Sequence, residues 1–122
     1  VIFLEESLHG DKLKTARRLF TKKIITSLPD VIITSNDLIA QGIISAAHEN
    51  GINIPNDMQI TGFDDLISSA YFIPSVTTVS QNIDELAKRC FSMLMDLINK
   101  KSAVSSIIEQ NIISRSSAKI NI

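Results

Sequence analysis

The chain has 122 residues, of which 44% are hydrophobic and 20% are charged, a size and composition typical of one globular domain or part of one. Twelve basic and thirteen acidic residues leave a formal net charge of −1, which argues against a clustered positive face that could hold a phosphate backbone. The single cysteine excludes an internal disulfide, and no apolar run approaches the roughly 18 residues of a membrane-spanning helix.

Strands and helices are predicted in alternation along the chain. The expected strands are residues 1–4, 31–35, 58–63, 76–79 and 107–113. The expected helices are residues 11–27, a second from Asn36 or Asp37 to Gly51, and a third that Asn82 caps with Glu85 as the return half of a capping box. This order is typical of an α/β fold with parallel strands and right-handed crossovers, so we expect a parallel-sheet sandwich.

Polar side chains directly follow three of the expected strands. They are Asn36 and Asp37, Asp64 and Asp65, and Gln81. Because the carboxyl ends of neighbouring parallel strands meet at one edge of a sheet, we expect these amide and carboxylate groups to converge there. Ligands bind at that edge in open α/β sheets. The sequence therefore predicts a receptor for a polar small molecule rather than a catalyst.

Groups that could carry catalysis or bind a metal are sparse in this sequence. His9 and His48 lie far apart, neither has a metal-ligand spacing, and no nucleophile elbow, phosphate loop or Cys–His pair is present. Asp64 and Asp65 are adjacent, so on an extended backbone they point to opposite sides and make a poor acid–base couple. We assign Asp65 a structural role and predict no catalytic residue, no metal and no cofactor.

Four segments form an ordered set that covers roughly residues 29–117. They are Pro29–Gly42, with Asn-Asp between a strand and a helix; Gly51–Asp65, which ends in Gly-aromatic-Asp-Asp; Pro74–Gln81, which fits Pro-x-x-Thr-Thr-x-x-Gln; and Ser114–Ser117, which fits a closing Arg-x-Ser/Thr. Together they resemble the effector domain of LacI/GalR-type bacterial transcription regulators.

The resemblance implies the C-terminal part of a two-lobed, periplasmic-binding-protein-like domain, type I and truncated. Residues 1–76 would form one incomplete lobe, residues 77–106 the crossover strand and helix of the other lobe, and residues 107–122 a final strand and a frayed tail. The helix-turn-helix that reads DNA would lie upstream of Val1, so we expect a fragment of a longer protein. In a fragment, the segment after residue 76 is free to pack differently or against another copy.

The resemblance also implies roles at single positions. Asn36, Asp64 and Gln81 match effector-contacting residues of the family, and their amide and carboxylate groups suit the hydroxyls of a sugar. Each has a structural alternative, as a helix cap, a turn residue and a solvated residue respectively. Leu8 is assigned to the same effector site, because it stands where some relatives carry an aromatic that stacks on the effector. Asp37 is assigned as the cap and dipole partner of the helix that follows.

The second expected helix carries more apolar surface than one sheet covers. We expect Ile39, Ile43 and Ala47 on this surface to face a twin subunit, with a small core helix as the alternative. Relatives also dimerise through this lobe. Tyr71 and Phe72 are assigned to the same interface or to core packing, with lining of the ligand pocket as the alternative.

Three functions remain open at this point. The favoured one is binding of a sugar or related metabolite by a homodimeric, cytoplasmic LacI/GalR-type regulator, which would hold operator DNA only through its absent N-terminal domain and would not contact a membrane. The alternative is the periplasmic or extracellular sugar-binding component of a transporter. An enzyme fits the sequence least, because no nucleophile, paired base or metal set is present.

Overall fold

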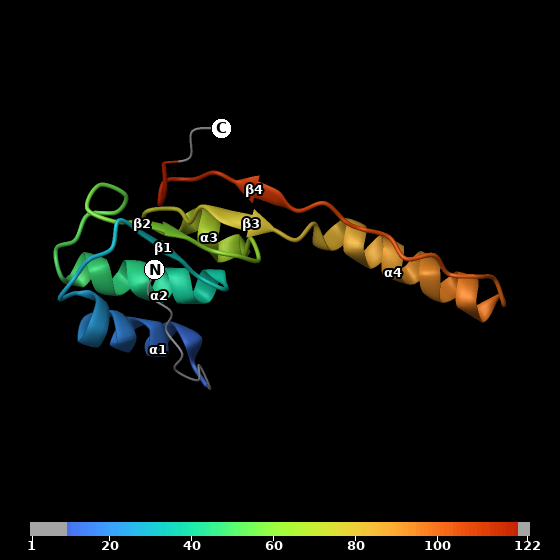
Figure 1. The fold of residues 1–122 in the computed structure, drawn as a ribbon, viewed down its shortest axis with the longest axis horizontal. Coiled ribbons are helices and arrows are strands. Elements are labelled where there is room, and N and C mark those ends of the chain that lie inside the picture. The colour runs from blue at the N-terminus through green and yellow to red at the C-terminus, as the bar shows by residue number, and fades with distance from the viewer. Residues whose placement is uncertain (1–9, 120–122) are drawn as a thin grey trace.

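The computed structural model describes residues 10–119, and Figure 1 shows their arrangement. In chain order the elements are α1 (Lys12–Leu19), the π-helix η1 (Phe20–Ile24), β1 (Val31–Ile33), α2 (Asp37–Glu49), β2 (Gln59–Thr61), α3 (Ile67–Tyr71), β3 (Thr78–Ser80), α4 (Ile83–Ile98) and β4 (Asn111–Ile113). The expected alternation of strands and helices is confirmed over this range. The strand expected at residues 1–4 and Leu8 lie outside the described residues.

A β1–α2–β2 unit forms the centre of the molecule. β1 and β2 pair in parallel, with Val31 opposite Gln59 and Ile33 opposite Thr61, and α2 makes the crossover between them. A parallel bridge between Thr61 and Thr77 extends this sheet toward β3, which pairs antiparallel with β4. The antiparallel β3–β4 pair differs from the expectation that all strands pair in parallel, and residues 10–119 form two two-stranded sheets rather than a complete parallel-sheet sandwich.

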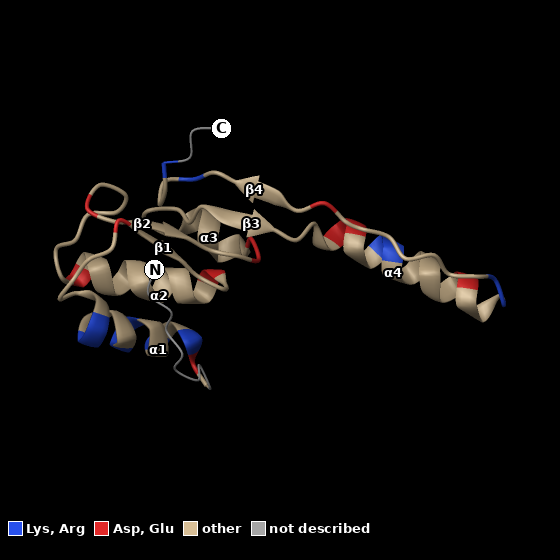
Figure 2. Ribbon diagram, viewed as in Figure 1, with Lys and Arg blue, Asp and Glu red and all other residues tan. Residues whose placement is uncertain are grey.

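α1 and α2 pack closely because Gly42 of α2 has no side chain. A Cβ atom at Gly42 would lie 2.5 Å from the carbonyl oxygen of Leu13 and 2.9 Å from Cβ of Ala16, so a larger residue would push the helices apart. Arg17 of α1 forms an ion pair with Glu49 of α2 at 2.6 Å. Figure 2 shows the Lys and Arg residues distributed along α1. In the view of Figure 1, α2 lies below β1 and β2, and α1 lies below α2.

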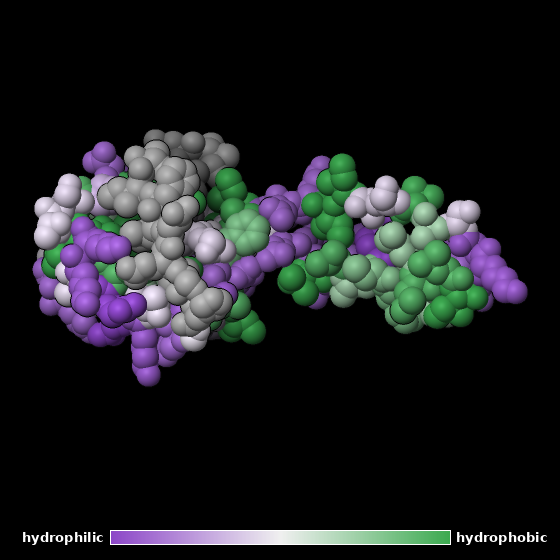
Figure 3. Space-filling model, turned by 60° about the horizontal axis from the view of Figure 1, so that its bottom comes forward, coloured by the Kyte–Doolittle hydropathy of each residue, from purple (hydrophilic) through white to green (hydrophobic). Residues whose placement is uncertain are grey.

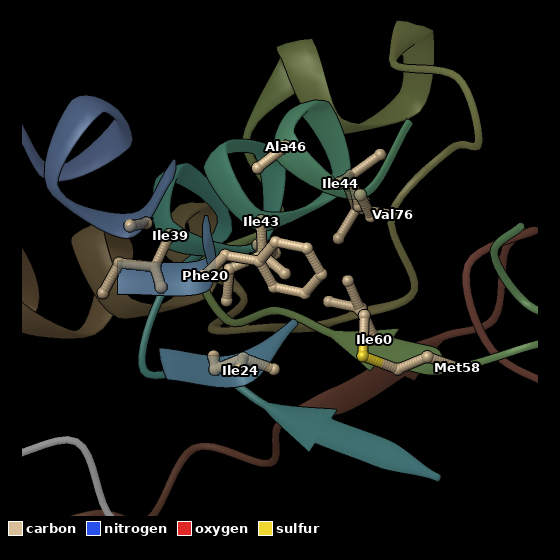
Figure 4. Close-up of a cluster of buried hydrophobic side chains, with 12 residues drawn as sticks. Phe20, Ile24, Ile39, Ile43, Ile44, Ala46, Met58, Ile60 and Val76 are labelled. Atoms are coloured by element: carbon tan, nitrogen blue, oxygen red, sulfur yellow. The ribbon is translucent and has the colours of Figure 1, made fainter. Parts of the chain in front are cut away.

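An apolar core fills the space between these helices and the β1–β2 sheet (Figure 4). Its fully buried large hydrophobic members are Phe20, Ile43, Ile44, Met58, Ile60 and Val76. The Phe20 ring from η1 lies beside Ile43 of α2 in the close-up. Burying side chains of this size stabilises the fold by about 1.5–3 kcal/mol each, so the core fixes α2 against the sheet.

Ile39, Ile43 and Ala47 belong to this core, and the prediction that they face a twin subunit is wrong. They are 8%, 1% and 0% exposed within the single chain. The prediction compared the apolar surface of α2 with the area of one sheet, but α1 and η1 cover the remaining surface. These three side chains are therefore not available to a partner.

The helix ends agree only partly with the sequence. Asp11 caps α1 through its side chain, and the single helix expected at residues 11–27 is α1 continued by η1. Asn82 precedes α4 but makes no side-chain cap hydrogen bond, and its φ is 51°. Glu85 pairs with Arg89 at 2.9 Å instead of completing a capping box.

α4 extends away from the rest of the molecule, and the chain returns from its far end to β4 (Figure 1). None of its residues is buried, and Phe91, Leu97 and Ile98 are 66%, 58% and 62% exposed. Figure 3 shows that hydrophobic side chains gather on this arm. The apolar face of α4 is thus uncovered among residues 10–119.

Candidate functional site

Asp64 and Gln81, two of the residues expected to bind ligand, are in direct contact. The Gln81 side-chain amide donates to Oδ1 of Asp64 at 2.6 Å. The backbone N–H of Asp64 donates to the carbonyl of Val79 at 3.0 Å, so β3 holds the loop that follows β2. Oδ2 of Asp64 has no hydrogen-bond partner among residues 10–119 and can accept a bond from a ligand.

Asn36 lies beside the same loop, at the start of α2. Its Oδ1 accepts the N–H of Ile39 at 3.0 Å, which makes Asn36 the N-cap of the helix. The next backbone N–H, of Asp37, donates to the carbonyl of Phe63 at 2.8 Å, so Asn36 and Asp64 flank one hydrogen-bonded pair. Asn36 is only 9% exposed, yet its Nδ2 has no partner within the described part of the chain and can donate to a ligand.

These three residues share one edge because the strands before them run parallel. β1 and β2 are parallel, and so is the bridge that links β2 to the segment leading into β3. Asn36, Asp64 and Gln81 follow the three strands at their carboxyl ends. We call this group the polar edge. It offers acceptors at Asp64 Oδ2 and Gln81 Oε1 and a donor at Asn36 Nδ2, a set that matches a neutral ligand with several hydroxyls.

Asp37 is the buried centre of the loops behind the polar edge. It is 0% exposed. Its carboxylate accepts three hydrogen bonds, from the N–H of Leu66 at 2.8 Å and from the hydroxyls of Ser69 and Thr78 at 2.6 Å each. The prediction that Asp37 caps α2 is wrong, because the residue before it is the cap. Asp37 instead joins the start of α2 to the loop before α3 and to β3.

Asp65 forms an ion pair with Arg115 at 2.6 Å, and the two side chains are 25% and 18% exposed. Arg115 also donates to the carbonyl of Val76 at 2.9 Å. Asp64 and Asp65 have φ angles of 109° and 55°, where residues with a side chain are uncommon. The two adjacent carboxylates have separate partners: Asp64 accepts from Gln81, and Asp65 pairs with Arg115.

The sequence does not single out Ser69, Thr78 or Arg115, although they bind the acidic residues of this region. Thr78 belongs to the Thr-Thr segment and Arg115 to the closing Arg-x-Ser segment, so both lie in segments that carry the family resemblance. Gly62 is a further sequence feature of this region, because a Cβ at that position would overlap Oδ1 of Asp37. The sequence does not show which of these residues bind one another, because the partners lie 29 to 50 positions apart along the chain.

Tyr71 and Phe72 take different environments. Tyr71 is 82% exposed, whereas Phe72 is partly buried and packs against the core. Ile67 and Ile73 are 83% and 86% exposed, so Tyr71 is one of three highly exposed apolar side chains in and just after α3. We call Ile67, Tyr71 and Ile73 the α3 patch.

Residues 10–119 contain no group of three or more His, Cys, Asp or Glu placed to hold a metal ion. Within the same range, no helix has the length and apolar character needed to cross a membrane.

Residues 4–118 match the family model of the periplasmic binding protein-like domain. The chain is 35% identical over 85 residues to the HTH-type transcriptional repressor PurR of Pasteurella multocida, a match that covers 70% of this chain and 25% of that protein. The structure of a periplasmic binding ribose operon repressor protein from Lactobacillus acidophilus matches with a TM-score of 0.82 and 32% identity, over 96% of this chain and 44% of that one. A LacI family transcriptional regulator from Enterococcus faecium with bound ribose matches with a TM-score of 0.78 and 25% identity, over 86% and 39%.

The chain spans about a quarter of the length of the curated relatives it matches. These relatives and the matched structures are described as repressors and regulators of transcription. The family model covers nearly the whole chain. The chain therefore belongs to the periplasmic binding protein-like domain family and corresponds to part of the effector-binding domain of LacI/GalR-type transcription regulators.

Proposed function

We propose that this chain helps to bind a small, neutral, hydroxyl-rich effector, with ribose as the first candidate. The observation that carries the proposal is the polar edge, where Asp64 and Gln81 are in contact and Asn36 lies beside them. A carboxylate oxygen accepts charge-assisted hydrogen bonds from sugar hydroxyls, and an amide can donate and accept at once. Ribose is named in the descriptions of two matched structures.

The polar edge binds rather than catalyses. Asp64 is hydrogen-bonded to Gln81, and Asp65 is paired with Arg115, so the adjacent carboxylates do not act as an acid–base couple. Effector binding would instead shift the protein between two conformations that differ in affinity for operator DNA. Such a regulator works in the cytoplasm. A transport role is not favoured, because the matched proteins are described as regulators.

A second lobe would complete the site. We assign residues 1–76 to one lobe, residues 77–106 to a strand and helix that join the other lobe, and residues 107–122 to the closing strand and tail. The uncovered apolar face of α4 supports this division, because a helix with that face requires a surface to cover it. Operator DNA would be bound by the part of the relatives that lies outside the match.

The α3 patch is our candidate for the dimer interface. Ile67, Tyr71 and Ile73 are each more than four-fifths exposed. Exposed apolar surface that includes an aromatic residue is typical of a protein interface. We propose the α3 patch in place of Ile39, Ile43 and Ala47, because those three side chains are buried in the core.

A thermal-shift titration of the full-length protein tests the effector proposal. The probe is D-ribose, with other pentoses, hexoses and nucleobases beside it, and the test variant is Asp64→Asn. Asn accepts a positive φ as readily as Asp, so this variant removes the charge while keeping the turn. Asp30→Asn is the matched control, since Asp30 is exposed and precedes β1 at the opposite end. We expect a sugar to stabilise the wild type and the control but not Asp64→Asn; equal stabilisation of all three would remove Asp64 from the site.

A further inference from the structure

The turn that carries Asp64 has an unfavourable backbone. Asp64 and Asp65 are consecutive residues with side chains, and their φ angles are 109° and 55°. Such angles cost free energy and persist only where surrounding contacts impose them. The contacts of this turn therefore decide where the Asp64 carboxylate lies.

One of these contacts comes from far along the chain. Arg115 follows β4 and reaches Asp65 with Nη2 at 2.6 Å. Its Nη1 donates to the carbonyl of Val76 at 2.9 Å, and its backbone N–H donates to Oγ1 of Thr77 at 2.9 Å. The guanidinium thus bridges the turn and the segment that leads into β3. A planar guanidinium can make both side-chain bonds at once, whereas the single ammonium of a lysine lacks that geometry.

On the other side, Asp64 has a contact that depends on the turn. Its Oδ1 accepts the side-chain amide of Gln81 at 2.6 Å, and Gln81 follows β3. If the turn relaxes to an ordinary backbone conformation, the Asp64 side chain changes direction and this bond breaks. The Gln81–Asp64 bond is therefore a reporter of the turn that needs no bound ligand.

We propose that Arg115 is a positioning residue for the effector site, acting through Asp65 to hold Asp64 in its binding direction. This role rests on the proposed function, because it takes the polar edge to be the effector site. It also couples the ligand to the closing segment of the chain, because whatever moves Arg115 moves Asp64. An exclusively structural role, in which the ion pair only stabilises the fold, is the competing explanation.

The test measures the side-chain amide resonances of Gln81 and Gln41 by ¹H–¹⁵N NMR in the full-length protein. Gln41 donates to Ser68 and Ser69 and not to the turn residues, so its resonances report on the packing of α2 against α3. The main variant is Arg115→Lys. Arg89→Lys is the matched control, because Arg89 pairs with Glu85 within α4 and neither residue belongs to the polar edge.

In Arg115→Lys we expect the Gln81 resonances to move toward those of a free amide while the Gln41 resonances stay in place. Asp65→Asn is a second variant, because Asn accepts a positive φ as readily as Asp and so keeps the turn foldable, but it lacks the charge that pairs with Arg115. It should release Gln81 in the same way, and the double variant should add nothing, since the two residues act as one unit. In a D-ribose titration, affinity should fall by about 3- to 30-fold in either single variant.

Two results overturn the proposal. One is a wild-type Gln81 spectrum in folded Arg115→Lys and Asp65→Asn proteins. The other is unchanged D-ribose affinity in both variants. If the wild type binds none of the tested sugars while the Gln81 resonances respond as expected, the effector proposal fails and the positioning role of Arg115 stands.

Discussion

Removing the Asp37 carboxylate should cost a large part of the stability of this domain. In Asp37→Ala three donors lose their acceptor: the N–H of Leu66 and the hydroxyls of Ser69 and Thr78. A buried donor left without a partner costs about 1–3 kcal/mol. The two hydroxyls can rotate toward other acceptors, whereas the backbone N–H cannot, so we expect a total loss of about 3–5 kcal/mol. Domains of this size have only about 5–15 kcal/mol in all.

The assay is urea denaturation of the full-length protein, followed by far-UV circular dichroism, with the free energy of unfolding taken from midpoint and slope. Asp37→Asn should lose about half as much, because the amide retains one acceptor oxygen and places an NH₂ group against the remaining donors. Asp30→Ala is the control, and as an exposed substitution it should change stability by about 0.5 kcal/mol or less. A midpoint for Asp37→Ala equal to that of the control would refute the role of Asp37 as a buried acceptor.

Three further outcomes follow from the same structure. Gly62→Ala should lower the free energy of unfolding by about 1–3 kcal/mol, because its Cβ would overlap Asp37 Oδ1; wild-type stability in urea would mean that the loop moves aside at no cost. Ile43→Lys places a charge in the core and should prevent cooperative unfolding rather than dissociate subunits, as circular dichroism during heating would show; a folded monomer would contradict the core assignment. Tyr71→Glu should shift the full-length protein toward monomer in sedimentation velocity with its thermal midpoint unchanged; an unaltered mass would remove the α3 patch from the interface.

The local sequence predicts the elements of this fold well because their signals are local. β-branched runs mark β1 and β2. The pattern also places the start of α2 at Asn36 or Asp37, although the cap is Asn36 and not the Asp37 that we expected. The contact between Asp64 and Gln81 also follows from a simple rule, since parallel strands deliver the residues after them to one edge. The positions of the helices and strands, and the edge at which parallel strands end, can thus be predicted from spacing along the chain.

The rest depends on which distant segments meet. The Asp37 carboxylate is buried because Leu66, Ser69 and Thr78 surround it, and nothing near Asp37 in the sequence announces those partners. The misassignment of Ile43 has the same origin. An excess of apolar surface on a helix shows that something covers it, but not whether the cover is a helix of the same chain or another subunit.

The most direct test of the effector site is a crystal structure of the full-length protein with the sugar that stabilises it most. We predict ligand oxygens within about 3 Å of Asp64 Oδ2, Gln81 Oε1 and Asn36 Nδ2. A sugar bound elsewhere, with none of these three atoms in contact, would contradict the assignment of the polar edge.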